Sequence, residues 1–228
     1  RQRVYALPAF RQRRACRVSD QCIEEAVRSA GRFFLREYER DDEMSNVNEI
    51  LAANERYAAD FGDKGDLPHH PTRHFAVVTC MDCRLDPAKF AGLSEGEANV
   101  IRNAGGRVTE DAIRSLLVSY KMLGTTEWFI IQHTHCGMQT FTNDEARDRF
   151  VADAQGLGIA ATEAYYVDFM PINGLIEENL VRDVAHLRRH PLVPASITIH
   201  GYIYDVHTGR LIVSEEAERI GAARQNCI

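Results

Sequence analysis

Short runs of apolar residues, separated by segments of helical periodicity, constrain the fold of this chain most. The run His74–Cys80 (HFAVVTC) is continuous and of strand length, which is typical of a strand covered on both faces. Glu127–Gln132 (EWFIIQ) has the same character. A short strand is also expected at Ala98–Arg102, and a late one at Ser196–Asp205. The chain therefore carries four predicted strands.

The segments between these strands have helical spacing. Thr109 is a suitable cap for a helix that Gly124 ends, and the apolar positions of that helix recur at i, i+3, i+4 and i+7: Ile113, Leu116, Leu117 and Tyr120. A further helix is expected over residues 175–190, where Pro191 stops it. Strands that alternate with helices pair in parallel through right-handed crossovers. We therefore predict an α/β fold with a mostly parallel central sheet flanked by helices.

The composition is that of a folded protein and argues against several classes of function. Of the 228 residues, 45% are hydrophobic and 26% are charged, which excludes disorder over most of the length. A net charge of -6 argues against a nucleic-acid partner, because phosphate binding needs clustered Lys and Arg. No apolar run approaches the roughly 20 residues of a membrane-spanning helix, so no membrane association is expected. Six cysteines are too few for a disulfide scaffold of this length, which favours a reducing, cytoplasmic compartment.

Residues 1–43 differ from the rest and are predicted to form an N-terminal extension. The first 19 residues hold six arginines and no acidic residue, as organelle transit segments do, and such a segment would direct the protein to the mitochondrion. The alternative is a leader that does not belong to the working protein, because a helix start follows Met44. In either case an amphipathic helix that needs a partner surface is expected over Cys22–Tyr38.

The remaining chain is predicted to divide into a main domain, residues 44–215, and a C-terminal tail, residues 216–228. The main domain is expected to begin with a helix near Asn46. The apolar residues of that helix predict a buried stripe that consists of Val47, Ile50, Leu51, Ala58 and Phe61.

The ends of two predicted strands carry the residues with the richest chemistry. One strand runs into Cys80-Met81-Asp82-Cys83-Arg84, and the other runs into His133-Thr134-His135-Cys136-Gly137. Ligands of open α/β sheets bind beyond the carboxyl ends of the strands. Together, Cys80, His133 and Cys136 offer two thiolates and one imidazole. They are a full set of protein ligands for a catalytic Zn²⁺ ion whose fourth position stays open.

Cys83 provides an alternative in which the zinc site is closed. With Cys80, His133 and Cys136 it could complete a four-ligand structural site, although structural zinc normally holds together a small, loop-rich module. A redox role for the Cys80-x-x-Cys83 pair is weaker, since Asp82 has no task in that chemistry. Several histidines are expected to be bystanders, because they lack a partner at coordinating spacing or are not needed for the site: His74, His135, His186, His190, His200 and His207.

Asp82 and Arg84 make the open site more specific. Their mutual attraction would keep the carboxylate ionised and oriented. An ionised Asp82 beside the metal can accept a hydrogen bond from the bound water, which leaves an oxygen lone pair aimed at a substrate. If Arg84 released it, the same carboxylate could take the fourth position on the metal and stop the reaction. The alternative is an ordinary surface ion pair, which contributes little, but the adjacency of Asp82 to Cys80 argues against it.

Three motifs in this order resemble those of the beta-class carbonic anhydrases. They are Cys80-x-Asp82-x-Arg84, Arg102-Asn103-Ala104-Gly105 after a short strand, and His133-x-x-Cys136-Gly137. The resemblance covers roughly residues 46–213. It implies zinc held by Cys80, His133 and Cys136, the pair Asp82 and Arg84 as catalytic dyad, and a twisted, mostly parallel sheet. It also implies N-terminal helices that extend onto a partner subunit, in a homodimer or a dimer of dimers.

The activity that this resemblance implies is the hydration of carbon dioxide to bicarbonate by a zinc-bound hydroxide. The chain would then be a zinc lyase of the carbonic anhydrase type. Carbonyl sulfide hydrolysis, with release of hydrogen sulfide, is the alternative, because Gly105-Gly106-Arg107 and the Cys136–Thr142 stretch look most like that branch of the family. The third hypothesis is a non-enzymatic protein with a closed structural zinc site. It predicts that Cys83 ligates the metal.

Overall fold

The computed structural model describes residues 46–156 and 166–223, and the chain forms two compact units, residues 1–62 and 63–228. The predicted extension, residues 1–43, and its helix at Cys22–Tyr38 lie outside the described residues. In the first unit the described helix is α2 (Asn46–Ala59), which begins where the sequence predicts.

The predicted burial of the α2 stripe is wrong for the chain as described. None of the residues of α2 is buried, and the apolar residues at the front of the helix are the most exposed, with Ile50 66% exposed and Val47 63%. Leu51, Ala58 and Phe61 are exposed as well. Periodicity establishes that a helix has an apolar face, but a single helix has no second surface of its own to cover that face.

The second unit is built on one five-stranded sheet with the strand order β2-β1-β3-β4-β5. The strands are β1 (Phe75–Cys80), β2 (Ala98–Asn103), β3 (Glu127–His133), β4 (Thr198–Tyr204) and β5 (Leu211–Val213). Neighbours among the first four pair in parallel, and β5 pairs antiparallel with β4. The structure thus confirms the predicted α/β fold with its mostly parallel sheet. β5 was not predicted, because three exposed residues carry no burial pattern.

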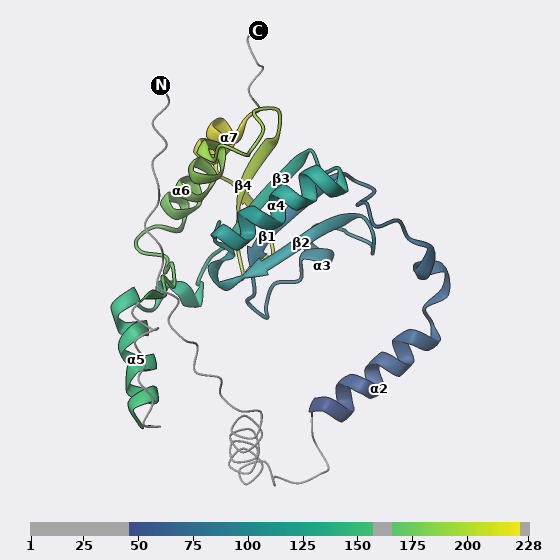
Figure 1. Ribbon diagram of the computed structural model, residues 1–228, viewed down its shortest axis with the longest axis horizontal. Coiled ribbons are helices and arrows are strands. Elements are labelled where there is room, and N and C mark those ends of the chain that lie inside the picture. Colours follow the sequence, from purple (N-terminus) through teal and green to yellow (C-terminus); the bar gives the residue numbers. More distant parts are fainter. Residues whose placement is uncertain (1–45, 157–165, 224–228) are drawn as a thin grey trace, which may run out of the picture. The chain divides into compact units, whose positions relative to one another are not determined.

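Three helices cover one face of this sheet: α4 (Glu110–Leu123), α6 (Ile176–Arg189) and α7 (Glu215–Gly221) (Figure 1). The main core lies between these helices and the strands. Its side chains from β1 and β3 are Ala76, Val78, Trp128 and Ile130, each of which is fully buried. The remaining short elements are η1 (Gly62–Asp66), α3 (Pro87–Phe90), η2 (Ala104–Gly106), η3 (Gly137–Gln139) and α5 (Asn143–Gly156).

Helix α4 shows that local sequence sets its ends. The Thr109 side chain accepts a hydrogen bond from the backbone N–H of Ala112, which satisfies one free donor of the first turn. Gly124 adopts the left-handed conformation (φ 75°), and its N–H closes the last turn on Tyr120 O. Both predicted ends of this helix are confirmed.

Helix α7 begins at the edge of the predicted tail and is part of the folded core. It packs against α6 and β4, and its Ala217 is fully buried. The Ser214 side chain caps it by accepting a hydrogen bond from Ala217 N. The sheet unit therefore extends to residue 221 at least.

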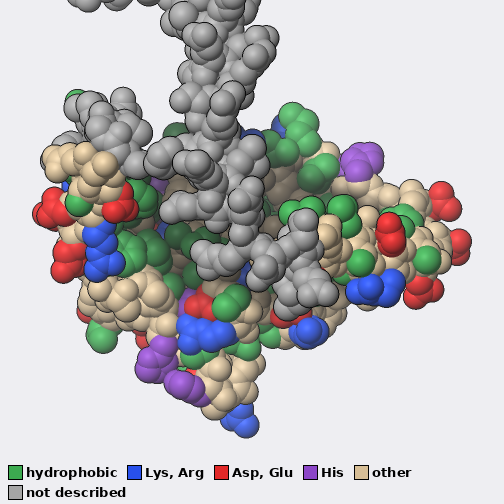
Figure 2. Space-filling model, turned by 90° about the horizontal axis from the view of Figure 1, so that it is seen from below, with side chains coloured by type: hydrophobic (Ala, Val, Ile, Leu, Met, Phe, Trp, Pro, Cys, Tyr) green, Lys and Arg blue, Asp and Glu red, His purple; other side chains and the backbone are tan. Residues whose placement is uncertain are grey.

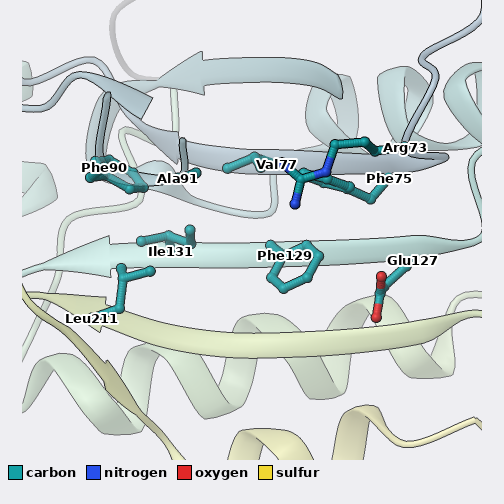
Figure 3. A pocket seen from close by; sticks show the side chains of 9 residues that line it. All are labelled: Arg73, Phe75, Val77, Phe90, Ala91, Glu127, Phe129, Ile131 and Leu211. Atoms are coloured by element: carbon teal, nitrogen blue, oxygen red, sulfur yellow. The ribbon is translucent and has the colours of Figure 1, made fainter. Parts of the chain in front are cut away.

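The opposite face of the sheet is only partly covered. Aromatic side chains of β1, β3 and β4 lie on it, and Phe90 of α3 packs against them. Between these side chains is a hollow of about 430 Å³ (Figure 3). The strand residues that line it are Phe75, Val77, Phe129, Ile131 and Leu211, and Phe90 and Ala91 line it from the end of α3. Arg73 and Glu127 line it at the amino ends of β1 and β3.

The surface carries charges of both signs. In the face shown in Figure 2, acidic and basic side chains lie interspersed, and neither sign fills a continuous patch. None of the helices in the described ranges has the length and apolar character that crossing a membrane takes.

Candidate metal centre

The carboxyl ends of β1 and β3 bring the predicted ligands together. Cys80 ends β1 and His133 ends β3, and because these strands are parallel neighbours, both residues lie at the same edge of the sheet. Cys136 follows three residues after His133, at the start of the η3 turn. The two sulfur atoms and a ring nitrogen lie within 4.8 Å of one another, and all three residues are buried. Such a cluster could bind a metal ion.

His133 is oriented for ligation through Nε2. Its Nδ1 lies 2.9 Å from the carbonyl oxygen of Thr134, which can only accept, so the proton is on Nδ1. Nε2 then carries the free lone pair. It is buried and has no hydrogen-bond partner among the described residues. An unpartnered buried nitrogen beside two thiols fits a metal ligand.

The two thiols are held by each other and by backbone amides. Cys80 Sγ and Cys136 Sγ lie 3.9 Å apart, and Gly105 N donates to Cys80 Sγ at 3.3 Å. The hydrogen bond from Cys136 lowers the pKa of Cys80, while the same contact and burial raise the pKa of Cys136. Two thiols this close in a buried site share a proton. Metal ligation requires thiolates, so binding of a cation would release this proton.

The turn η2 brings the backbone close enough to Cys80 for this N–H···S contact. Gly105 has φ 81°, a conformation that side chains disfavour. At Gly106, which also has positive φ, a Cβ atom would lie 2.9 Å from Cys80 N and 3.0 Å from Ile131 O. The two glycines therefore allow η2 to lie directly on the ends of β1 and β3.

Asp82 and Arg84 form a forked ion pair at the rim of the cluster. Arg84 Nε donates to Asp82 Oδ1 at 2.9 Å, and Arg84 Nη2 donates to Oδ2 at 2.6 Å. These hydrogen bonds hold the pKa of Asp82 well below its usual range. Asp82 Oδ2 also lies 3.7 Å from His133 Nε2, so an ionised carboxylate faces the place where the three ligand atoms converge.

Two further contacts fix this rim. Arg84 Nη2 donates to His135 O at 2.9 Å, which ties the turn after β1 to the turn after β3. Arg102 Nε donates to Cys80 O at 3.0 Å, and its Nη2 donates to Asp82 O at 2.7 Å. The sequence marks Arg102 as a motif residue only. Its role as a clamp on the Cys80–Asp82 backbone needs the pairing of β1 with β2.

Cys83 is not part of the cluster. Its thiol is free and exposed, and among the described residues the metal-competent group consists of Cys80, His133 and Cys136 alone. His135 is exposed and packs against His207, with ring centroids 4.9 Å apart. His200 differs from His133 in that both of its ring nitrogens face carboxylates at 2.8 Å, those of Glu127 and Glu218.

Comparisons with known proteins identify the family of the chain. The family model described as carbonic anhydrase matches residues 75–211, which is more than half of the chain. The chain belongs to the beta-carbonic anhydrase family. It is 40% identical over 168 residues to beta-carbonic anhydrase 1 of Mycobacterium tuberculosis, an alignment that covers 74% of this chain and 97% of that protein.

A solved carbonic anhydrase from Streptococcus mutans superposes with a TM-score of 0.68 at 44% identity and covers 75% of this chain and 99% of that one. The family has a second branch among the relatives. A carbon disulfide hydrolase of Acidianus sp. is 34% identical over 159 residues, which cover 61% of this chain and 76% of that enzyme. The beta-carbonic anhydrase fold of this chain is thus shared by enzymes named for two different substrates.

Proposed function

We propose that this protein catalyses the zinc-dependent hydration of carbon dioxide to bicarbonate. The observation that carries the proposal is the buried Cys80–His133–Cys136 cluster with an ionised aspartate at its rim. The 40% identity to a beta-carbonic anhydrase over nearly that protein's whole length supports the choice of substrate.

The donor set suits zinc. Two cysteine sulfurs and one histidine nitrogen are typical zinc ligands, and three protein ligands are the number that catalytic zinc sites use. When bound, zinc lowers the pKa of a coordinated water from about 15.7 towards neutrality, which is the chemistry the reaction needs. Cys80, His133 and Cys136 would hold the ion. Cys83, exposed and outside the cluster, leaves the set at three.

Asp82 is the residue that would orient the attacking water. Its Oδ2 faces the ligand cluster and, because the carboxyl is ionised, can only accept a hydrogen bond. When the water donates a hydrogen bond to Asp82, a lone pair of the water oxygen would point towards the substrate carbon. Arg84 occupies both carboxylate oxygens from the other side and so fixes this orientation.

Hydrolysis of a carbon–sulfur substrate is the second candidate, and the 34% identity to carbon disulfide hydrolases favours it. Carbonyl sulfide and water would give carbon dioxide and hydrogen sulfide. Carbon disulfide and two waters would give carbon dioxide and two hydrogen sulfides. These linear molecules have the same electrophilic carbon as carbon dioxide, so the same residues would act on each of them.

One purified preparation tests these alternatives. Zinc content is measured first, and then carbon dioxide hydration and sulfide release from carbonyl sulfide and carbon disulfide are measured side by side. We expect hydration to dominate, to disappear when a chelator removes the metal, and to return with added zinc. Sulfide release without hydration would favour the second candidate. A zinc-loaded protein inactive on all three substrates would contradict both candidates.

We also propose that the protein works as a homodimer or a dimer of dimers. The exposed apolar residues of α2, including Val47, Ile50 and Leu51, support this, because such a stripe is stable when another surface covers it. Sedimentation of the full chain should therefore give a mass of at least two subunits. A monomer at micromolar concentration would contradict the proposal.

A further inference from the structure

A second Asp–Arg pair lies in the interior, beneath the metal centre. Arg107 Nε donates to Asp183 Oδ2 at 2.7 Å, and Arg107 Nη2 donates to Oδ1 at 3.0 Å. The side chains are only 8% and 5% exposed. Breaking such a pair is costly, but replacing both partners with apolar residues is often neutral for stability. Its presence in a sheet that already has a large apolar core therefore calls for a role other than stability.

The pair reaches the Cys80 segment through η2. Arg107 N donates to Asn103 Oδ1 at 2.8 Å, and Asn103 Nδ2 donates to Arg107 O at 2.7 Å. The residues on either side of η2 are therefore joined by two hydrogen bonds. Within that turn lies Gly105, whose N–H donates to Cys80 Sγ. Fixing Arg107 thus fixes the amide that faces the first thiol.

The same pair reaches the other two ligand segments. Gln132 Nε2 donates to Asp183 Oδ2 at 3.0 Å, and Gln132 directly precedes His133 on β3. On the other side, Arg107 Nη1 donates to Met170 O at 2.6 Å and to Pro171 O at 3.1 Å.

The residue after Pro171 completes the connection to Cys136. Ile172 N donates to Met138 O at 2.8 Å, and Met138 lies in η3, the turn that Cys136 begins. Met170 has φ 49°, a conformation that a non-glycine residue keeps when its surroundings hold it. Its carbonyl is held by Arg107.

We propose that Arg107 and Asp183 are positioning residues that set the relative placement of the three metal ligands. One buried ion pair connects the segments of Cys80, His133 and Cys136 while neither partner belongs to the ligand cluster itself. The inference rests on the proposed function in that it assumes these three residues bind zinc.

The experiment compares zinc affinity with thermal stability in Asp183→Asn, which keeps the size of the side chain and removes its charge. Affinity is measured by competition with a chromophoric chelator, and the Tm is measured on the metal-free protein. Loss of an outer partner of a ligand weakens metal binding by about 10–100-fold, and because Asp183 reaches the ligands only through Arg107 and Gln132, we expect a loss at the lower end, about 10-fold. The absorption bands of the cobalt-substituted protein should change as well, because the ligand geometry is altered.

Two further variants separate positioning from stability. Thr125→Val removes a buried hydroxyl that contacts Ser119 and Trp128 at the amino end of β3. It should lower the Tm but leave zinc affinity within about twofold, since distant sites act independently. The double variant Arg107→Met with Asp183→Leu removes both charges together, so that no unpaired charge stays buried, and should keep the weakened zinc affinity. It also serves as the test if Asp183→Asn does not fold.

The outcomes are distinct. If the unaltered protein binds no zinc, the proposed function fails. If the unaltered protein binds zinc and Asp183→Asn binds it equally well, the positioning role is overturned and the proposed function stands. Recovery of zinc affinity together with Tm in the double variant would also overturn it, because the pair would then act through stability alone.

Discussion

Two Asp–Arg pairs lie near the candidate metal centre, and they differ in almost every physical respect. Asp82 and Arg84 are two residues apart on one turn, and the Arg84 side chain is 46% exposed. Arg107 and Asp183 are 76 residues apart and buried. Both are forked pairs, so the guanidinium geometry is the same. The two pairs differ in what they contact. Asp82 of the rim pair presents a carboxylate to the ligand cluster. The buried pair, Arg107 and Asp183, makes its hydrogen bonds to other protein groups.

This difference shows that the same Asp–Arg interaction can either orient a carboxylate towards the reacting groups or hold protein segments in place, depending on its position in the fold. An ion pair whose arginine is open to water, as Arg84 is, contributes little to stability, because water competes for the charge. The effect of Arg84 is instead to keep the Asp82 carboxylate ionised and oriented towards the ligand cluster. We therefore expect changes at the rim to affect turnover and to leave zinc content alone, the reverse of what we expect for the buried pair.

The largest effect is expected from Asp82→Ala. Without the carboxylate no group orients the attacking water, and kcat/KM should fall by at least about 10²-fold, the loss that follows when a reacting group is misplaced. Zinc content, measured on the same sample, should remain at one ion per chain, since Asp82 is not one of the three clustered ligands.

Glu216→Ala is the matched control for this change. Glu216 is likewise a carboxylate paired with an arginine, Arg219, but it lies on α7 and is more exposed than Asp82. It should leave activity unchanged. Loss of zinc in Asp82→Ala, or activity close to that of the unaltered protein, would remove the distinction between the two pairs.

A smaller effect is expected from Arg84→Lys. Lysine keeps the positive charge but cannot donate to both oxygens of Asp82 and to His135 O in fixed geometry. A displacement of about 1 Å at a catalytic group costs up to about 10²-fold, so we expect kcat/KM to fall by about 10–100-fold with zinc unchanged. Arg219→Lys on α7 is the control. An activity loss greater than that of Asp82→Ala would show that Arg84 does more than orient its partner.

The smallest effect is expected from Cys83→Ala. The thiol lies between the two rim residues in sequence but is exposed and outside the cluster. Zinc content and activity should be retained, and the free energy of unfolding should change by no more than about 0.5 kcal/mol, as is usual at the surface. Met81→Ala, also exposed on this turn, is the control. Loss of zinc from Cys83→Ala alone would establish the closed, four-ligand site.

Much of the fold could be predicted because short stretches of sequence specify it. The strands at Phe75–Cys80 and Glu127–His133 are continuous apolar runs, and α4 carries its own cap and its own terminating glycine. That Cys80, His133 and Cys136 come together could also be predicted, since each lies within a few residues of a strand end and parallel strands share an edge.

Other features depend on contacts that no local pattern encodes. The stripe of α2 predicts an apolar face correctly but cannot say whether this chain covers it, and here it is exposed. The three residues of β5 gain their strand character from pairing with β4. The clamp of Arg102 on the Cys80–Asp82 backbone exists because β2 lies next to β1.

The sequence by itself determined the four parallel strands, the main helices between them and the candidate metal ligands, since residue type and short spacing are enough to specify them. Only the tertiary structure decided how the centre is held. Arg107 meets Asp183 across 76 residues, and Gly105 meets Cys80 across 25. Such pairs arise from the packing of α6 and η2 onto the sheet, and that packing reflects the three-dimensional arrangement of the whole core.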